Sequence, residues 1–508
     1  MFLKITTKKY KGQVHKQASI VKTIREGNKL RQKLIRNLGA IHTIKDENKA
    51  KQLIEDYKKG RLLISLEDSN ELCFEYGVSF LISNLWKELE LNKFFTSGKK
   101  YDYNEILSLM ISHRLHNYGS CNLSEREAHR WICEEAYTQL PDIELHQLYR
   151  ILKILYLRKE DLEKHLFSKC QKNGMAILYD LTSSYVEGDY VKSNLVNFGY
   201  NRDKKKGKKQ IVLGLLLKDG LPIAHKVWRG NTPDKTTLNE AIIQAKSFGI
   251  TDFIFIADRG LITEKNINFI EEENLQYIIA TQRRKGKIVK ELMQKEITSE
   301  VAKVHFDPKT KRVYYLCFNK YVASAQLSDL EEMRKVLEGK LSKLKDPAEH
   351  KVYAMLGKAS KYFKFKFKPF SFELNKENFD YEKAIAGKYL LITNNLKLSA
   401  EDIDKTYRQL AEIERAFGEL KHLENMRPIF HKRDDGIKAH LFLCVLTLFF
   451  ERLIKKRVDC KNIREVLEEM KKLKVCKAKE HYVRTDITKE QEKIIKSLGF
   501  IEPPKVIK

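Results

Sequence analysis

Two short apolar runs that each stop at an aspartate limit the possible folds of this sequence more than any other feature. Ala176–Tyr179 is followed by Asp180, and Phe253–Ala257 is followed by Asp258. Short runs of this kind, rich in isoleucine and aromatic residues, are typical of strands that are buried on both faces. Such strands need helices packed on both sides of their sheet. We therefore predict an α/β fold in which each aspartate stands at the end of a buried strand.

The surrounding sequence predicts the other elements of a mixed sheet flanked by helices. Residues 44–170 have apolar side chains three and four positions apart, which predicts a mainly helical N-terminal region. Further along, Asp219-Gly220 favours a two-residue hairpin turn between two apolar stretches. Around and beyond this turn we expect strands at Gln210–Leu217, Pro222–Trp228 and Tyr277–Ala280, and helices at Thr236–Phe248 and Glu264–Glu273.

A strand-rich stretch, residues 286–394, follows the second aspartate. We interpret it as an insertion, because the helix beyond it carries a third acid that suits the first two. Within the insertion we expect strands at Val301–Phe306, Arg312–Phe318, Tyr362–Phe372 and Lys388–Thr393, and a charged helix at Leu327–Leu344.

One long helix is predicted at Ser399–Leu423. On this helix Tyr407, Glu414 and Lys421 are spaced by seven residues, which is close to two turns, so the three share one stripe. An adjoining apolar stripe would pack on the sheet, and it consists of Leu410, Ile413, Phe417 and Leu420.

The three acids suggest a site for divalent ions. Mg²⁺ prefers oxygen ligands, and a few carboxylates suffice to hold it. Two such ions can activate a nucleophile and stabilise the leaving oxygen when a phosphodiester is cleaved. Asp180, Asp258 and Glu414 are the candidate ligands, whereas the competing acids Glu412 and Glu419 do not share the stripe of Glu414.

The charge of the chain favours a polyanionic partner. Its 508 residues include 96 lysines and arginines against 68 acids, which gives a net charge of +28. Cationic side chains bind nucleic acid with release of condensed counterions. The first forty residues hold eleven lysines and arginines but one acid, Glu26, and alternating stretches there predict a small basic sheet.

The eight cysteines are scattered without a CxxC pair, which argues against both a zinc module and a disulfide framework. The N-terminus lacks the apolar segment of a signal peptide, and no apolar run is long enough to span a bilayer. We therefore expect a cytosolic protein in a reducing compartment.

Three segments resemble the bacterial insertion-sequence transposases of the DDE class. Tyr407, Glu414 and Lys421, followed by Arg427-Pro428-Ile429, resemble the tyrosine-arginine-glutamate-lysine signature of these enzymes. Tyr179-Asp180-Leu181-Thr182 resembles their first catalytic strand, and Ala257-Asp258-Arg259-Gly260 resembles their second. The signature's arginine would stand at Leu410, so its role is left unassigned.

The resemblance implies a ribonuclease H-like catalytic core. In this core Asp180, Asp258 and Glu414 would be the catalytic residues and the ligands of two Mg²⁺ ions, for which Mn²⁺ can substitute. It also implies that Tyr407 and Lys421 contact transposon-end DNA. We expect Arg259 to meet phosphate as well, because it directly follows the second aspartate.

The expected function is binding of double-stranded DNA at the element ends, metal-dependent hydrolysis there, and joining of the 3′ ends to target DNA. A homodimer in the DNA complex and a place in the bacterial cytoplasm at the nucleoid would accompany it. Two alternatives fit the same residues: a structure-selective nuclease on this core, and a non-catalytic DNA-binding derivative.

The expected domains are a basic sheet (1–43), a helical DNA-binding or dimerisation region (44–170), the catalytic core (171–285 and 395–455), the insertion (286–394) and a helical tail (456–508).

Overall fold

In the computed structural model, the described residues are 2–507 with several gaps. The gaps are 11–12, 27–28, 42, 44–45, 49, 52–53, 55–72, 97, 99, 121–122, 170–175, 203–204, 206, 250–252, 262, 283, 285, 423–425 and 479–480. The chain divides into two compact units, which are described separately. The larger unit comprises residues 76–472 and 488–502, and the smaller one comprises residues 1–75, 473–487 and 503–508.

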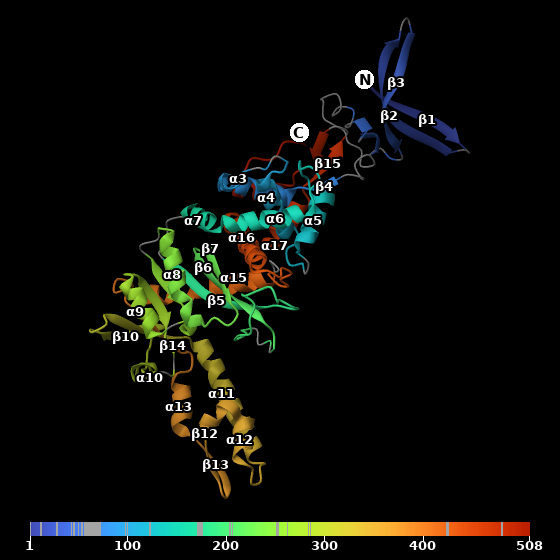
Figure 1. Cartoon of the computed structure of the whole chain (residues 1–508). Helices are drawn as coiled ribbons and strands as arrows, with labels where there is room; N and C mark the ends of the chain where they lie inside the picture. Colours follow the sequence, from blue (N-terminus) through green and yellow to red (C-terminus); the bar gives the residue numbers. More distant parts are fainter. Residues whose placement is uncertain are drawn as a thin grey trace. The chain divides into compact units, whose positions relative to one another are not determined.

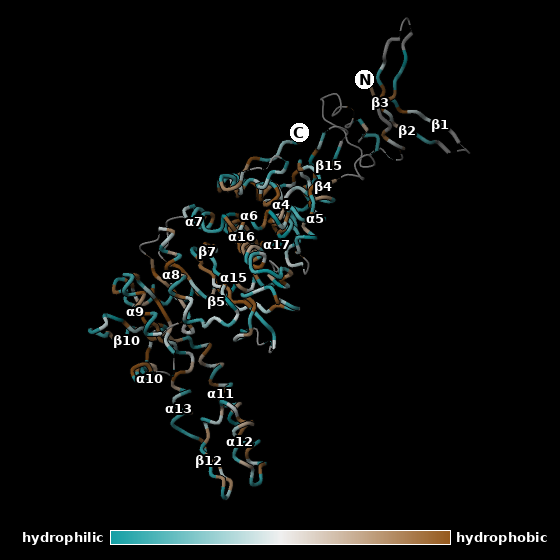
Figure 2. Tube along the Cα trace, viewed as in Figure 1, coloured by the Kyte–Doolittle hydropathy of each residue, from teal (hydrophilic) through white to brown (hydrophobic). Residues whose placement is uncertain are grey.

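An eight-stranded sheet is the centre of the larger unit, with the strand order β10-β11-β14-β9-β8-β5-β6-β7. Its apolar strands stand out in brown in Figure 2, in keeping with their burial. The strands are β5 (Ala176–Tyr185), β6 (Gln210–Lys218), β7 (Leu221–Arg229), β8 (Ile254–Ala257), β9 (Gln276–Ala280), β10 (Val301–Asp307), β11 (Arg312–Phe318) and β14 (Lys388–Thr393).

The pairing of the first five strands is that of a ribonuclease H-like sheet, as predicted. β5, β6 and β7 form an antiparallel meander, whereas β8 pairs with β5 in parallel and β9 pairs with β8 in parallel. The turn between β6 and β7 is the predicted two-residue Asp219-Gly220 turn, and both residues have positive φ (51° and 79°). Two consecutive positive φ values define the turn type that matches the twist of a hairpin.

Helices cover both faces of this sheet (Figure 1). On one face, residues of α14 (Ala400–Arg408), α15 (Leu410–His422) and α16 (Asp434–Val458) share a hydrophobic core with Leu178, Ile256 and other strand residues. The opposite face carries α8 (Leu238–Ser247), since the Tyr179 hydroxyl donates to Thr237 at its start. Next to α8 lie η2 (Asp234–Thr236), η3 (Arg259–Leu261) and α9 (Glu264–Glu272).

The strands predicted within residues 286–394 belong to two different parts of the fold. β10, β11 and β14 extend the central sheet, because β14 pairs with β9. A separate small core forms around Phe363 and Phe379. It is built from α11 (Lys320–Leu341), α12 (Glu349–Leu356), η4 (Gly357–Tyr362), β12 (Phe363–Phe367), β13 (Phe370–Leu374) and α13 (Lys376–Ala384), while α10 (Lys287–Gln294) packs against β14 and α13.

The single strand expected at Tyr362–Phe372 is wrong, because the chain turns back at Lys368-Pro369 to form the β12–β13 hairpin. A proline lacks the backbone N–H that a continuing ladder needs. The predicted alternation is nevertheless present in β12. Lys364 and Lys366 are exposed, whereas the phenylalanines that alternate with them, Phe363, Phe365 and Phe367, are partly or fully buried.

The N-terminal part of the larger unit is helical, as predicted. Ser124 caps α5 by accepting a hydrogen bond from the Glu127 amide. α6 and α4 pack against α16, which joins this region to the central sheet through its contacts with β7. The helices of this part are α3 (Gly77–Glu88), η1 (Leu91–Phe94), α4 (Tyr103–His116), α5 (Glu125–Glu134), α6 (Leu145–Leu157) and α7 (Lys159–Lys169). Two helices from the C-terminal end of the chain join them, because α17 (Ile463–Lys471) packs against α3 and α4, and α18 (Lys489–Ser497) packs against α17.

The smaller unit contains two sheets. The predicted basic sheet is antiparallel and consists of β1 (Phe2–Tyr10), β2 (Gln13–Glu26) and β3 (Lys29–Ile41). The second sheet has the order β17-β16-β15-β4 and consists of β4 (Cys73–Glu75), β15 (Lys474–Ala478), β16 (His481–Arg484) and β17 (Val506–Ile507). The purely helical tail predicted for 456–508 is therefore wrong. Its strands have two to five residues, which is too short to show a periodicity.

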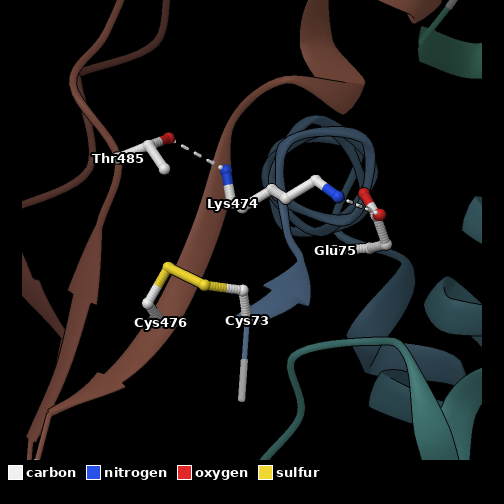
Figure 3. The surroundings of a disulfide bond; sticks show 5 residues. All are labelled: Cys73, Glu75, Lys474, Cys476 and Thr485. Atoms are coloured by element: carbon white, nitrogen blue, oxygen red, sulfur yellow. Dashed lines mark hydrogen bonds and ion pairs between the residues drawn. A yellow bond between two sulfur atoms is a disulfide. The ribbon is translucent and has the colours of Figure 1, made fainter. Parts of the chain in front are cut away.

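A disulfide joins Cys73 on β4 to Cys476 on β15, a feature that the scattered cysteines did not predict (Figure 3). The two cysteines are 403 residues apart in the sequence but are direct partners in the antiparallel register. Beside them Lys474 forms a 2.8 Å ion pair with Glu75, and the Lys474 amide donates to Thr485. The pairing of the two strands, and not a local motif, creates this bond.

None of the helices in the described part of the chain combines the length and apolar character that a membrane crossing requires.

Candidate active site

The parallel register of β5 and β8 places the two predicted aspartates side by side. Tyr179 is the partner of Ala257, so Asp180 and Asp258 are the next residues on neighbouring strands. Side chains two positions apart share a face of a strand. Asp180 therefore shares the face of Leu178, and Asp258 shares the face of Ile256. Because both apolar residues belong to the core shared with α15, the two carboxylates emerge on the α15 side of the sheet.

Asp258 directly follows β8, as predicted, but Asp180 lies within a strand. β5 continues to Tyr185, because β6 offers a hydrogen-bonding partner along its whole length. Residues 181–185 include a threonine and two serines, and all three are buried. Because these residues are polar, the sequence pattern predicted that the strand ends too early, at Asp180. The early part of β5 has two neighbours, whereas its pairing with β8 stops at Tyr179. Asp180 therefore stands where the sheet opens on one side.

Glu414 reaches the same region from α15. Ile413, Ala416, Phe417 and Leu420 of this helix are buried in the core, while Glu414 is exposed at its border. The competing acids are already engaged. Glu412 pairs with Arg415, and Glu419 accepts from the buried Arg452 at 2.7 Å. Among the described residues, Glu414 forms no such ion pair.

The three carboxylates influence one another electrostatically. Burial, together with the negative charges of Asp258 and Glu414, raises the pKa of Asp180 to about 7, against the lowering effects of the Leu181 amide and Arg202. Like charges that meet at one site disfavour ionisation. A divalent cation would reverse this effect, and an all-oxygen ligand set of this kind suits Mg²⁺ or Mn²⁺. The residues present therefore fit a metal site.

A basic loop adjoins the acids. The Arg202 amide donates to Ser183 of β5 at 2.9 Å, and its guanidinium pairs with Asp234 at 2.6 Å. Arg202 is not among the residues that the sequence predicted for the site, because no local pattern ties it to Asp180. The loop folds back along β5 because the β5–β6 hairpin carries a long connection.

The residues expected to contact DNA lie in different settings. The predicted long helix is interrupted at Gln409, where bonds between residues three apart replace the regular helical ones. Tyr407 therefore lies in the last turn of α14, whereas Lys421 belongs to α15. The Tyr407 ring lies 5.9 Å from the Tyr389 ring and is partly buried against the core. Lys421 is also partly buried. Arg259 begins η3, and its side chain lies outside the described residues.

Leu410, at the place of the signature arginine, is a core residue with 8% exposure. The two neighbouring arginines of α14 and α15 whose side chains the structure describes are engaged elsewhere. Arg408 pairs with Asp404 at 2.7 Å, and Arg415 pairs with Glu412 on the exposed side of α15.

A second cluster with metal-binding side chains lies where α5 meets α16. Ligand atoms of Glu125, His431 and His440 lie within 4.8 Å of one another. The guanidinium of Arg114 lies 3.9 Å from Glu125 and already supplies a positive charge there. Sequence reasoning missed this cluster, because Glu125 is far from the two histidines in the sequence.

Comparison with known proteins gives two family matches. The family model for the transposase DDE domain matches residues 174–450, which is more than half of the chain. The model for the N-terminal domain of IS1634 family transposases matches residues 3–63. No curated protein matches the chain.

Two solved structures show weak similarity. One is a synaptic complex of piggyBac transposase with hairpin DNA, with 9% identity and a TM-score of 0.37, covering 78% of this chain and 77% of that chain. The other is a Mos1 transposase paired-end complex with the left transposon end, with 10% identity and a TM-score of 0.16, covering 47% of this chain and 67% of that chain.

Proposed function

The chain belongs to the transposase DDE domain family, whose members cleave DNA and transfer the cut strand, and we propose that Asp180, Asp258 and Glu414 carry this chemistry here. The observation that supports the assignment most is the convergence of the three acids. They come from β5, the end of β8 and α15, yet the charges of Asp258 and Glu414 both act on Asp180. The identity of the enzyme as a DNA transposase rests on the family match.

Each acid has a role as a metal ligand in this proposal. Members of the family generally use divalent metal, and we assign two Mg²⁺ ions, replaceable by Mn²⁺, to Asp180, Asp258 and Glu414. When bound, such ions activate a nucleophile and stabilise the leaving oxygen of a phosphodiester. β5 and the end of β8 carry the two aspartates, and α15 carries Glu414. The raised pKa of Asp180 means that the carboxyl must lose its proton as the ions bind.

The substrate in this proposal is double-stranded DNA, first at the element ends and then at the target. The net charge of +28 supports a polyanionic partner. We assign DNA contacts to Tyr407, Lys421 and Arg259. Joining two ends requires two active sites, so we propose a homodimer in the DNA complex. We place this cut-and-paste reaction at the nucleoid in the bacterial cytoplasm, and we assign the helical region 44–170 to DNA binding or dimerisation.

A pair of matched variants on one helix tests the proposal. Glu414→Gln removes the proposed ligand, whereas Glu412→Gln removes an acid two residues away that pairs with Arg415. With DNA from the element's own flanks and Mg²⁺, we expect Glu414→Gln to lose cleavage and strand joining. Glu412→Gln should keep both, and both variants should bind the ends. Cleavage by Glu414→Gln at the wild-type rate would refute the assignment of the site.

A further inference from the structure

The connection between β5 and β6 holds two aromatic side chains in solvent. Phe198 is 62% exposed and Tyr200 is 84% exposed. Aromatic residues contribute large stabilisation when buried, so a pair left in water on one short segment is unusual. The aromatic residue Trp228 on β7 is in contrast only 8% exposed, and its indole N–H donates to Glu240.

The backbone that carries the two rings is fixed to the catalytic sheet. Asn197 exchanges both backbone hydrogen bonds with Gln210, and the Gln210 side chain donates to the Tyr200 carbonyl. Between the rings, the Gly199 backbone runs so close to Gly230 that a Cβ atom would lie 1.9 Å from its carbonyl oxygen. The rings are therefore displayed from a rigid support.

The same connection is anchored near its middle to the loop that follows α15. The Tyr190 hydroxyl donates to the Ile429 carbonyl, and Ser193 donates to Asp434 at 2.5 Å. The segment thus bridges the strand that carries Asp180 and the loop beyond the helix that carries Glu414.

The surroundings of the rings are basic and adjoin the acids. The Lys209 ammonium lies 5.8 Å from the centre of the Phe198 ring, and Lys205 is exposed. Arg202, two residues beyond Tyr200, is close enough to lower the pKa of Asp180. Two described acids near these cations are already paired, since Glu187 faces Lys208 at 3.6 Å and Asp234 faces Arg202.

We propose that Phe198 and Tyr200 form a platform on which unpaired bases of the DNA stack beside the phosphodiester that is cut. The proposal deepens the function proposed above and rests on it. Exposed aromatic faces among cations are the combination that binds single-stranded nucleic acid, because bases stack on the rings while cations meet the phosphates. An apolar protein surface would bury the rings but would offer no negative charge to Lys205 and Lys209 beside them. A duplex alone would use only the cations, since its bases are stacked on one another.

The test compares two DNA probes in the absence of divalent metal. The probes are a short oligothymidylate and a perfectly paired duplex. Phe198→Ala combined with Tyr200→Ala is expected to lose roughly ten-fold or more in affinity for the oligothymidylate. Affinity for the duplex should change by less than about two-fold, because phosphate contacts dominate there. The exposed rings support no core, so the variant is expected to fold normally.

Two controls separate stacking from other effects. Phe198→Tyr combined with Tyr200→Phe keeps both aromatic faces and should bind like the wild type. Tyr321→Ala removes a 76% exposed ring that also has a lysine beside it, Lys320, and should leave oligothymidylate binding unchanged.

Wild-type affinity of the double alanine variant for the oligothymidylate would overturn the proposal. Equal losses for both probes would overturn it as well, since stacking predicts a loss confined to the single strand. Neither readout involves cleavage, so this test can fail while Glu414→Gln behaves as expected. The opposite result is also possible. If the double alanine variant loses binding of the oligothymidylate while Glu414→Gln still cleaves, the platform is supported and only the catalytic assignment is refuted.

Discussion

Replacing Asp180 with asparagine is expected to stabilise the metal-free protein while it abolishes cleavage. The folded protein raises the pKa of this carboxyl from 3.8 to about 7 through burial and the charges of Asp258 and Glu414. At pH values above 7 the folded state must therefore carry a charge that the unfolded state accommodates more easily. A pKa difference of this size corresponds to roughly 4 kcal/mol. Because Asp180 is not fully enclosed, we expect a measured gain of about 1–2 kcal/mol.

The sign of the pH dependence follows from proton binding. Between pH 4 and 7 the Asp180 carboxyl is more protonated in the folded state than in the unfolded chain, so the contribution of this group to stability falls as the pH rises. The advantage of Asp180→Asn should be absent near pH 4, should grow up to about pH 7 and should stay constant above it. Mg²⁺ should reverse the order, because a cation held by the carboxylates stabilises the wild type more than the variant.

Thermal unfolding in EDTA and in Mg²⁺, at several pH values, measures these differences. Glu412→Gln is the control, because its carboxylate pairs with Arg415 and should give no gain in EDTA. An Asp180→Asn variant that is less stable than the wild type at pH 8 in EDTA would refute the reasoning. So would equal stabilisation of both proteins by Mg²⁺, since the three carboxylates would then not form the metal site.

Two further predictions concern the support of α15. Arg452→Ala removes a buried guanidinium that donates to Glu419, to the Gly220 carbonyl and to the Glu412 carbonyl, and should cost about 3 kcal/mol in thermal or denaturant unfolding. Adding Glu419→Gln should recover part of this loss; a loss that the second change does not reduce would argue against the ion pair. Leu410→Arg, which restores the residue type of the family signature, should destabilise the protein by about 2–4 kcal/mol and should not raise cleavage, because the position is buried. A stable Leu410→Arg variant with faster cleavage would show that this side chain can reach the DNA.

Residues that repeat a local pattern could be read from the sequence. The β6–β7 hairpin follows from Asp219-Gly220 between apolar stretches, and β11 and β14 have the predicted bounds. Asp258 was placed correctly because its apolar strand ends abruptly. Glu414 was chosen over Glu412 and Glu419 by spacing alone, and the structure adds a physical reason, since the other two acids form ion pairs.

Features that depend on distant partners could not be read in this way. β5 was predicted too short, because its polar second half is kept in the sheet by β6. The interruption at Gln409 breaks a helix whose apolar spacing runs on without a break. The cluster of Glu125 with two histidines and the sheet that includes β4 both join segments hundreds of residues apart. Exposure, which singled out Phe198 and Tyr200, is a property of the folded chain only.

The pairing of β4 with β15 has a consequence for how the protein is made. β4 leaves the ribosome long before its partner exists, because 403 residues separate the two bonded cysteines. At the usual pace of synthesis this delay lasts roughly 20–80 s. Throughout that time β4 lacks the strand that pairs with it in the finished sheet, while the segments that carry Asp180, Asp258 and Glu414 are synthesised. This sheet can therefore close only after the segments with all three acids have been synthesised, and a chain released before residue 474 would carry all three acids but leave β4 without β15.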